Sequence, residues 1–393
     1  MIDIEYYKFK ILILNKDICL KGGSFVLNRN EQKVFELLNE NPYLSQQAIA
    51  DQLDMNRSTV ATIISSLTDK RKILGKAYIL NHDSEVVCIG GINIDRKYTL
   101  EEAFVPKTSN PVISSISVGG VARNIAENLG RLNVNVSLLS VAGQDQDYDF
   151  IKQETETYVD LNQVTIYPNE STSSYSAILD NDGEMQFALA DMSISDHMDY
   201  EWIQEHRQLL IQSKLIVLDL NVSKEVVQEV INIALKNNIE LVIIPVSGPK
   251  MKRLPNDLEG VGWLIVNLDE SETYHQISVE SDKDVELLAD KWLETGIEQV
   301  LITRGKKSSV YAHQDGTRYE VTPPLNEQVV DVTGAGDSNA SGIIYGITKQ
   351  FEAKESIQLG MTNAYHTVQS NHTVRHNLNE KQFLLENESL HKV

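Results

Sequence analysis

Apolar residues return every three or four positions in residues 28–41 and 57–70, which is the period of an amphipathic helix. Ser45, a favoured N-cap residue, opens a shorter helical run at residues 45–53. The segment KILGKAYIL, residues 72–80, reads as a β-hairpin with Gly75 at its bend. This order of elements predicts a winged helix-turn-helix domain over residues 28–81.

The second helix of such a pair is the one that enters the DNA major groove with its N-terminal residues. Here these residues are Asn56, Arg57, Ser58 and Thr59. The basic residues expected to face phosphates from the wing are Lys70, Arg71, Lys72 and Lys76. Residues 28–81 carry seven Lys/Arg against six Asp/Glu, so a helical domain for dimerisation or protein contact stays an alternative.

Residues 85–393 alternate short β-branched apolar runs, such as EVVCIGG and KLIVLDLN, with helix-like stretches. That alternation predicts an α/β domain with a mostly parallel sheet covered by helices. Residues 171–191 break the pattern and read as a hairpin that turns at Asn181-Asp182-Gly183. We expect this hairpin to project as a small β flap that excludes water from the acceptor site.

Charge is distributed unevenly over the 393 residues, whose net charge is −21. Residues 1–27 and 28–81 each carry +1, so residues 82–393 carry −23 and should repel nucleic acid. Two cysteines form no disulfide framework, and the chain shows neither a membrane-spanning run nor a signal peptide, which predicts a cytoplasmic protein. Residues 1–27 form an extension without a clear period, and we expect residues 1–26 to be a mis-annotated start.

The motif DVTGAGD, residues 331–337, places glycines between an apolar run and a predicted helix. The amides of Gly334, Ala335 and Gly336 would form an anion-binding nest at the helix start. Asp337 would then take the proton of an attacking hydroxyl as general base. The alternative is a capped helix start, where the helix dipole favours an acidic residue.

Two further glycine pairs precede polar residues. Gly119-Gly120 opens a predicted helix that carries Asn124, and Gly90-Gly91 ends a strand just before Asn93 and Asp95. Ligands sit at the C-terminal strand ends of open α/β sheets, where a carboxylate and an amide suit sugar hydroxyls. Each pair by itself could also be a turn with polar caps.

Asn267 and Glu270 follow another strand and share one helical turn. They could hold a hydrated Mg²⁺, or they could cap the helix. We predict no zinc site at His366, His372 and His376, because their surroundings favour no helix and offer no further ligand.

The stretches GGVARNIAENLGRLNVNVSLLSVAG and DVTGAGDSNASGII resemble the two signatures of the ribokinase-like, or PfkB, carbohydrate kinase family. The resemblance covers about residues 85–385 and is strongest to the pseudouridine kinase-like branch, some members of which carry an N-terminal helix-turn-helix. It implies a ribokinase-like fold with a small β lid. It also implies ATP, Mg²⁺, a monovalent cation such as K⁺ near residues 331–333 and 370–377, and transfer to a sugar hydroxymethyl group. We also expect a homodimer.

The resemblance also implies roles for single residues. Asp337 matches the catalytic base, and residues 334–336 match the anion hole. The positions that match acceptor-binding residues are Asn93, Asp95, Gly119, Gly120 and Asn124. Asn267 and Glu270 match the Asn-x-x-Glu motif, with Glu270 beside the metal. Thr303 and Gly305 match a nucleotide-contacting turn.

The resulting hypothesis is an ATP-dependent kinase for the 5′-hydroxymethyl group of a nucleoside or sugar, with pseudouridine as the first choice. One alternative is a ligand-sensing transcriptional regulator that uses a kinase fold as its effector domain. Another is a kinase for ribose, fructose or a purine nucleoside.

Overall fold

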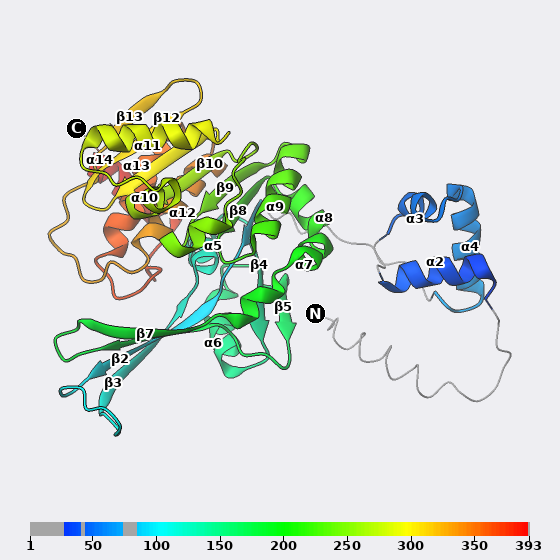
Figure 1. Ribbon diagram of the computed structural model, residues 1–393, viewed down its shortest axis with the longest axis horizontal. Helices are drawn as coiled ribbons and strands as arrows, with labels where there is room; N and C mark the ends of the chain where they lie inside the picture. The colour runs from blue at the N-terminus through cyan, green and yellow to red at the C-terminus, as the bar shows by residue number, and fades with distance from the viewer. Residues whose placement is uncertain (1–26, 41–43, 74–84, 392–393) are drawn as a thin grey trace. The chain divides into compact units, whose positions relative to one another are not determined.

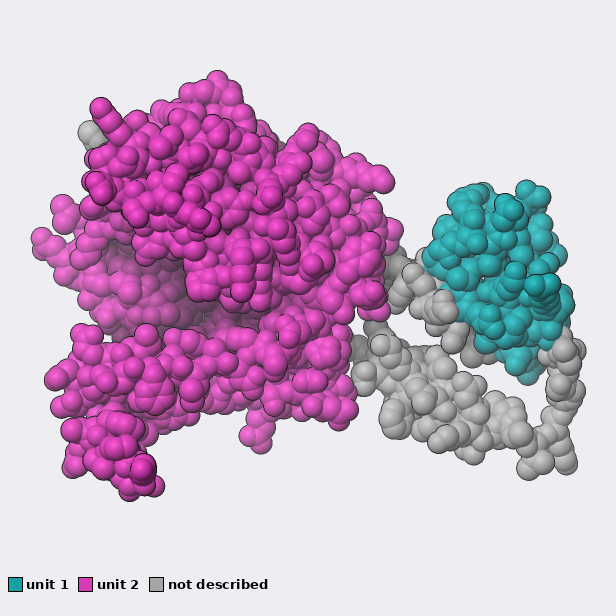
Figure 2. All heavy atoms as spheres, in the orientation of Figure 1, with its two compact units in different colours: residues 1–80 teal, residues 81–393 magenta. Residues whose placement is uncertain are grey.

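The computed structural model describes residues 27–40, 44–73 and 85–391. The chain divides into two compact units, Met1–Leu80 and Asn81–Val393 (Figure 2). The predicted N-terminal extension and the predicted wing hairpin, with Gly75 and Lys76, lie outside the described residues.

The first unit contains α2 (Arg29–Glu40), α3 (Gln46–Leu53) and α4 (Arg57–Asp69). The Ser45 hydroxyl accepts from the Ala48 amide, so the predicted N-cap of α3 is confirmed. Asp54 adopts a left-handed conformation with φ of 52° in the turn between α3 and α4. The three helices bury one apolar cluster, made of Val34, Ile49, Ala50, Val60, Ile63 and Leu67.

One ion pair joins the first and last of these helices. Glu31 is 3% exposed, and its carboxylate accepts from Lys70 Nζ at 2.6 Å and from the Ser66 hydroxyl at 2.7 Å. Lys70 therefore faces into the unit and not toward a phosphate as the sequence suggested, because a buried carboxylate requires a partner. Arg71 and Lys72 are exposed.

The second unit is built around one large sheet (Figure 1). Within residues 85–391, nine strands follow the order β13-β12-β11-β10-β9-β8-β1-β4-β5. The strands from β11 to β5 are parallel, while β12 runs antiparallel to β11 and β13 runs antiparallel to β12. The strands are β1 (Val86–Ile89), β4 (Val136–Gly143), β5 (Val164–Tyr167), β8 (Leu215–Asp219), β9 (Glu240–Ile244), β10 (Trp263–Asn267), β11 (Gln299–Arg304), β12 (Lys307–His313) and β13 (Arg318–Val321).

Helices cover both faces of this sheet. Val87 and Ile89 of β1 belong to one core, while Val86 and Cys88 belong to the other, as alternation along a strand requires. The helices on the Val87 face are α7 (Tyr200–Glu205), α8 (Arg207–Gln212), α9 (Lys224–Asn237), α10 (Leu268–His275) and α11 (Asp282–Glu294). Those on the Val86 face are α5 (Val121–Arg131), α12 (Ala335–Thr348), α13 (Ala353–Thr367) and α14 (Glu380–His391). The predicted α/β fold is confirmed.

A second sheet projects from this body as a lid (Figure 1). Among the described residues it has the order β3-β2-β6-β7, with β2 (Asn93–Leu100), β3 (Val112–Gly119), β6 (Ser174–Leu179) and β7 (Met185–Asp191). The predicted hairpin is β6–β7, and its turn at residues 181–183 is confirmed by hydrogen bonds between Asp180 and both Gly183 and Glu184. The lid is larger than predicted, because β2 pairs with β6 from a distant part of the chain and β3 pairs with β2.

Shorter elements complete the second unit. Helix α6 (Gln146–Thr155) packs against β2 and β3 at the base of the lid. The 3-10 helices are η1 (Ser193–His197) and η2 (Gly248–Arg253). Both stand beside the space between the lid and the C-terminal strand ends, since Ser195 and Lys250 line it.

Candidate active site

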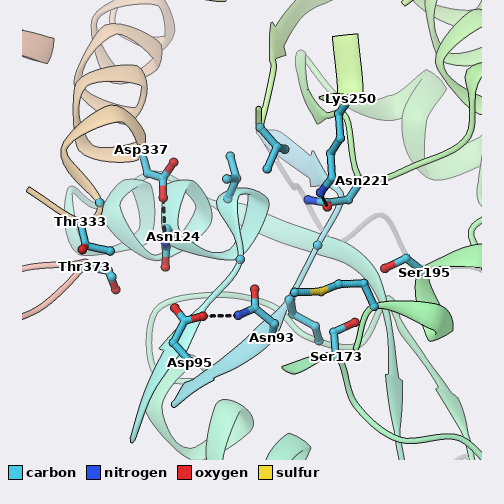
Figure 3. A pocket seen from close by; sticks show the side chains of 17 residues that line it. Asn93, Asp95, Asn124, Ser173, Ser195, Asn221, Lys250, Thr333, Asp337 and Thr373 are labelled. Atoms are coloured by element: carbon cyan, nitrogen blue, oxygen red, sulfur yellow. Dashed lines mark hydrogen bonds between the residues drawn. The ribbon is translucent and has the colours of Figure 1, made fainter. Parts of the chain in front are cut away.

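The C-terminal ends of the central strands and the base of the lid enclose a hollow of about 210 Å³ (Figure 3). Segments far apart in sequence meet there: the β1–β2 corner, the start of α5, the end of β8 and the start of α12. The predicted site residues that line the hollow are Asn93, Asp95, Gly120, Asn124, Gly334 and Asp337.

Asn93 and Asp95 present a linked amide and carboxylate to this space. Asn93 Nδ2 donates to Asp95 Oδ1 at 2.6 Å. Burial raises the pKa of Asp95, although the Asn93 hydrogen bond and the charges of Arg123 and Lys97 oppose that rise. A fixed acceptor beside a fixed amide suits the paired hydroxyls of a sugar.

The glycines of the β3–α5 junction allow a close approach of the chain. Gly120 has φ of 100°, and a Cβ there would lie 2.3 Å from the Gly91 carbonyl oxygen. A Cβ at Gly119 would lie 2.3 Å from Asp95 Oδ2. Of these two predicted acceptor-binding residues, Gly120 lines the hollow and Gly119 does not. These glycines let α5 approach the β1–β2 corner.

The fully buried Asp219 holds this junction together. Its Oδ2 accepts from the amides of Gly91 and Ala122, each at 3.0 Å, and its Oδ1 accepts from the Asn221 amide at 2.7 Å. Asn221 Nδ2 adds a fourth hydrogen bond at 2.9 Å. A Cβ at Gly90 would lie 2.1 Å from this carboxylate, so position 90 accepts only glycine without rearrangement.

Asn124 contacts the predicted base directly. Its Nδ2 donates to Asp337 Oδ2 at 2.7 Å. The buried Arg123 guanidinium donates to Asn124 Oδ1, to Glu127 and, at 3.0 Å, to the Val118 carbonyl. Arg123 therefore fixes which end of the Asn124 amide faces Asp337.

The Asp337 carboxyl group is suited to exchange a proton near neutral pH. Burial raises its pKa to about 7. The Asn124 hydrogen bond opposes the rise, the charge of Asp219 adds to it, Arg123 again opposes it, and Asp95 contributes least. A general base works best when its pKa is close to the operating pH.

Helix α12 begins at Ala335, directly after Gly334 with φ of 81°. A Cβ at Gly334 would lie 2.3 Å from the Thr373 carbonyl oxygen, and one at Gly336 would meet open space. The Ala335 amide donates to the Val332 carbonyl at 3.2 Å, so it is partly engaged within the chain. The amides of Gly336 and Asp337 lie in the first helical turn, which provides no backbone acceptor for them.

The predicted nucleotide residues lie on neighbouring strand ends outside the hollow. Asn267 of β10 is in register with Thr303 of β11, and Gly305 follows with open space around it. Asn267 and Glu270 form a reciprocal capping box, with Asn267 N to Glu270 Oε2 at 2.9 Å. The capping alternative is therefore realised. A Mg²⁺ at Glu270 would have to share this buried carboxylate, whose pKa burial raises to about 7.

Asp331, at the start of the expected potassium site, has neither carboxylate oxygen free. Asp331 Oδ1 accepts from the amide and hydroxyl of Thr333 at 2.8 and 2.6 Å, and Asp331 Oδ2 accepts from Lys97 Nζ at 2.9 Å. Both carboxylate oxygens are engaged by donors, and an ammonium group already provides the positive charge. This arrangement does not fit a potassium ion bound to Asp331.

Sequence reasoning missed the side of the hollow opposite Asp337. Figure 3 shows Lys250, Asn221, Ser173 and Ser195 on that side. Lys250 Nζ donates to Asn221 Oδ1, and burial lowers the pKa of Lys250. Asp219 and Asn221 end the apolar run KLIVLDLN, so the strand-end argument that identified Asn93 and Asn267 would have found them too.

The described residues form neither a metal-binding cluster nor a membrane-spanning helix. In that part of the chain, no three His, Cys, Asp or Glu side chains are placed to hold a metal ion. No described helix is long and apolar enough to cross a membrane.

The chain matches known families in both units. Residues 83–379 match the model of the pfkB family carbohydrate kinases, and residues 27–73 match that of winged helix-turn-helix DNA-binding domains. The uncharacterized sugar kinase YeiI of Escherichia coli is 28% identical over 86% of this chain and 93% of its own length. The pseudouridine kinase of Escherichia coli is 32% identical over 66% of this chain and 82% of its own length. Arabidopsis thaliana ribokinase, solved with ribose and ATP, shares the fold with a TM-score of 0.69 at 17% identity, over 78% of this chain and 99% of that structure.

The raised pKa of Asp337 predicts a stability cost at alkaline pH. The folded state binds this proton more tightly than the unfolded state, so stability falls as pH rises through about 7. We expect Asp337→Asn to raise the Tm at pH 8 by about 2–4 °C, and the gain to shrink at pH 5.5. Scanning calorimetry at both pH values measures it.

Asp331→Asn is the matched control, because Thr333 and Lys97 lower the pKa of that carboxyl against the effect of its burial. It should lower the Tm at pH 8. A lower Tm for Asp337→Asn at pH 8 would contradict the electrostatic description of the site.

Proposed function

Because the chain belongs to the pfkB family of carbohydrate kinases, and is thus a phosphotransferase with an alcohol group as acceptor, we propose that it phosphorylates the 5′-hydroxyl of a nucleoside. The observation that carries the proposal is the Asp337 carboxylate, which is bound to Asn124 and lines the same hollow as the Asn93–Asp95 pair. A base and a hydroxyl-binding pair in one enclosed space are what transfer to an alcohol requires.

In the proposed reaction, Asn93 and Asp95 hold the sugar hydroxyls and Asp337 accepts the proton of the attacking one. The acceptor oxygen bonds to the γ-phosphorus of ATP as the bond from that phosphorus to the bridging oxygen breaks, and ADP leaves. Amides of the first turn of α12 and its dipole offset the negative charge on the transferred group. ATP supplies the phosphoryl group, as in the ribokinase that was solved with it.

We place the nucleotide beside the ends of β10 and β11, where Thr303 and Gly305 lie. Mg²⁺ would approach Glu270 through water, since the ion keeps several waters in protein sites. Potassium is not part of the proposal, because Asp331 is already engaged by Lys97 and Thr333.

Pseudouridine is the proposed acceptor. The relative that is 32% identical is a pseudouridine kinase. Lys250 supplies ammonium donors and Asn221 an amide on the side of the hollow away from Asp337, and Ser173 and Ser195 add hydroxyls (Figure 3). Such a polar wall suits a base rich in N–H and C=O groups better than it suits a bare sugar.

Comparison of acceptors tests the proposal. Purified full-length protein with MgATP should consume ATP fastest, in kcat/KM, with pseudouridine in a panel that includes uridine, adenosine, inosine, ribose and fructose. Asp337→Asn should lower kcat by about 10²–10⁴-fold with nucleoside binding nearly intact. Asp257→Asn, an exposed carboxylate on the surface, is the control and should change nothing.

Turnover of another acceptor would keep the kinase and remove pseudouridine. Tight binding of one compound without turnover of any would favour the alternative, a transcriptional regulator that senses the ligand.

We further propose that the first unit binds DNA through α4. Asn56, Arg57, Ser58 and Thr59 are exposed at the N-terminal end of this helix, where recognition helices meet base edges. The near-neutral charge of residues 28–81 makes base contacts more important than phosphate contacts for affinity.

Selection of duplexes from a randomised library by the full-length protein should yield an enriched sequence. Arg57→Ala should then weaken binding about tenfold or more in fluorescence anisotropy, because one bidentate arginine–base contact is worth about 1–3 kcal/mol. Lys33→Ala, on the exposed surface of α2, should have little effect. No enrichment, or equal losses for both variants, would rule out this role for α4.

The last part of the proposal is a homodimer formed through the lid. Leu189, Phe187 and Ile116 are 61%, 46% and 51% exposed. Register places them on one face, since Arg96 is opposite both Ile116 and Ser176, and Ser176 is opposite Leu189. Asp95, one residue from Arg96, points to the opposite face and into the hollow, so the apolar face is the outer one. Helix-turn-helix proteins commonly bind paired half-sites as dimers, which suits a second copy there.

Light scattering after gel filtration should give twice the chain mass of 44.2 kDa for the wild type. Leu189→Asp should give the monomer mass, whereas Leu385→Asp, at a leucine of similar exposure on α14, should not. A wild-type monomer at micromolar concentration would refute the dimer.

The cytoplasmic location stays a prediction from the sequence.

A further inference from the structure

A second hollow, of about 440 Å³, lies at the N-terminal ends of the parallel strands of the large sheet. Glu240, Trp263 and Gln299 line it, and they are the first residues of β9, β10 and β11. The candidate active site lies at the C-terminal ends of the parallel strands, so roughly 15 Å of sheet separates the two spaces. The remaining wall comes from β12, β13, the end of α12 and the start of α13.

Glu240 contributes a carboxylate that the described residues leave without a hydrogen-bond or ion-pair partner. Its Oε1 lies directly over Gly262, where a Cβ would come within 2.1 Å, so glycine there makes room for it. Burial and the negative charge of Glu298 raise the pKa of Glu240 to about 7. Glu240 is half-buried and lines the hollow, so a ligand there can donate to its carboxylate.

Aromatic rings form the wall beside this carboxylate. The rings of Trp263 and Tyr311 are 5.6 Å apart, and those of Tyr311 and Tyr319 are stacked at 4.6 Å. The Tyr311 hydroxyl donates to Gln299, but the buried Tyr319 hydroxyl has no partner among the described residues. Two polar groups that lack partners therefore belong to one aromatic hollow.

The surrounding charges favour a cation. His313 lies 3.4 Å from Glu298 and 3.0 Å from Asp315, so two further carboxylates stand on the β11–β12 side. On the α13 side, Glu352 and Lys354 line the hollow with opposite charges. With Glu240, the carboxylates outnumber the basic groups, and the field disfavours an anionic ligand.

We propose that this hollow binds a small organic ammonium ion, an amine that carries a short apolar stem. The ammonium group would donate to the Glu240 carboxylate, the stem would lie on the half-buried Tyr319 ring, and the Tyr319 hydroxyl would gain a partner. Aromatic faces attract cations, and a carboxylate in a partly dry site gives the charge-assisted hydrogen bond its strength. The proposal does not depend on the kinase reaction.

Calorimetric titration of the full-length protein at pH 8 tests it, with n-butylammonium chloride as the probe and 1-butanol as its neutral counterpart. Butylammonium should bind saturably and butanol should not. Glu240→Gln should weaken binding at least tenfold, and Tyr319→Phe severalfold. Glu298→Gln, which removes a nearby carboxylate that does not line the hollow, should change it by less than threefold.

The dependence on pH gives an independent reading. Glu240 must lose its proton to pair with the ammonium ion, so affinity should fall about tenfold from pH 8 to pH 6. Other titratable or charged groups also face this region: Glu298, His313, Asp315, Glu352, Lys354, Tyr311 and Tyr319. If Glu240 is the group that titrates, the Glu240→Gln variant should lose the pH dependence of the affinity, although these other groups are still present. Absence of saturable binding at 50 mM butylammonium, or unchanged affinity in Glu240→Gln, would overturn the proposal.

Discussion

The candidate active site depends on one buried charge, the carboxylate of Asp219. Four N–H groups from three segments point at it: the β1–β2 corner, the first turn of α5 and the end of β8. Neutral contacts would not hold these segments so firmly, because a fully buried carboxylate requires all its donors to stay in place. Gly90 and Gly120 serve this arrangement by letting the backbones meet. Asn93, Asp95 and Asn124 then face one space.

Burial and neighbouring charges together explain how a carboxylate can serve beside an anion-binding helix start. Burial is the main cause of the raised pKa of Asp337, and the charges of Asp219 and, less, Asp95 add to it. The positive charge of Arg123 opposes this rise in pKa. Arg123 makes no hydrogen bond to Asp337, but it donates to Asn124, which in turn donates to Asp337. With a pKa of about 7 the base is only partly ionised near neutral pH, so it adds less repulsion to a bound phosphate than an ordinary carboxylate would.

The lid and the second hollow show how much is built by pairing distant strands. Residues 171–191 form a hairpin on their own, but β2 joins it in parallel across some 80 residues of sequence. The pairing turns a flap into a sheet with one face toward the hollow and one apolar face outward. At the N-terminal ends of the parallel strands, the stacked Tyr311 and Tyr319 come together with Glu240 only because β9 to β13 are neighbours.

The sequence by itself determined the three helices of the first unit, the α/β class of the second and the identity of Asp337, Asn93, Asp95 and Asn124. These features follow from local periodicity, capping and glycine placement, and the two motifs that carry most of the site are short. Only the tertiary structure decided that Gly119 and Gly120 admit the chain itself, that Glu270 caps α10, and that Lys70 pairs with Glu31. It also decided that Lys250 and Asn221 complete the hollow. The glycine contacts, the Lys70–Glu31 pair and the Lys250–Asn221 pair depend on partners far away in sequence, and no local pattern encodes which donor a buried carboxylate will find. The Glu270 cap is local, three residues from Asn267, and there the structure only decided between two alternatives that the sequence offered.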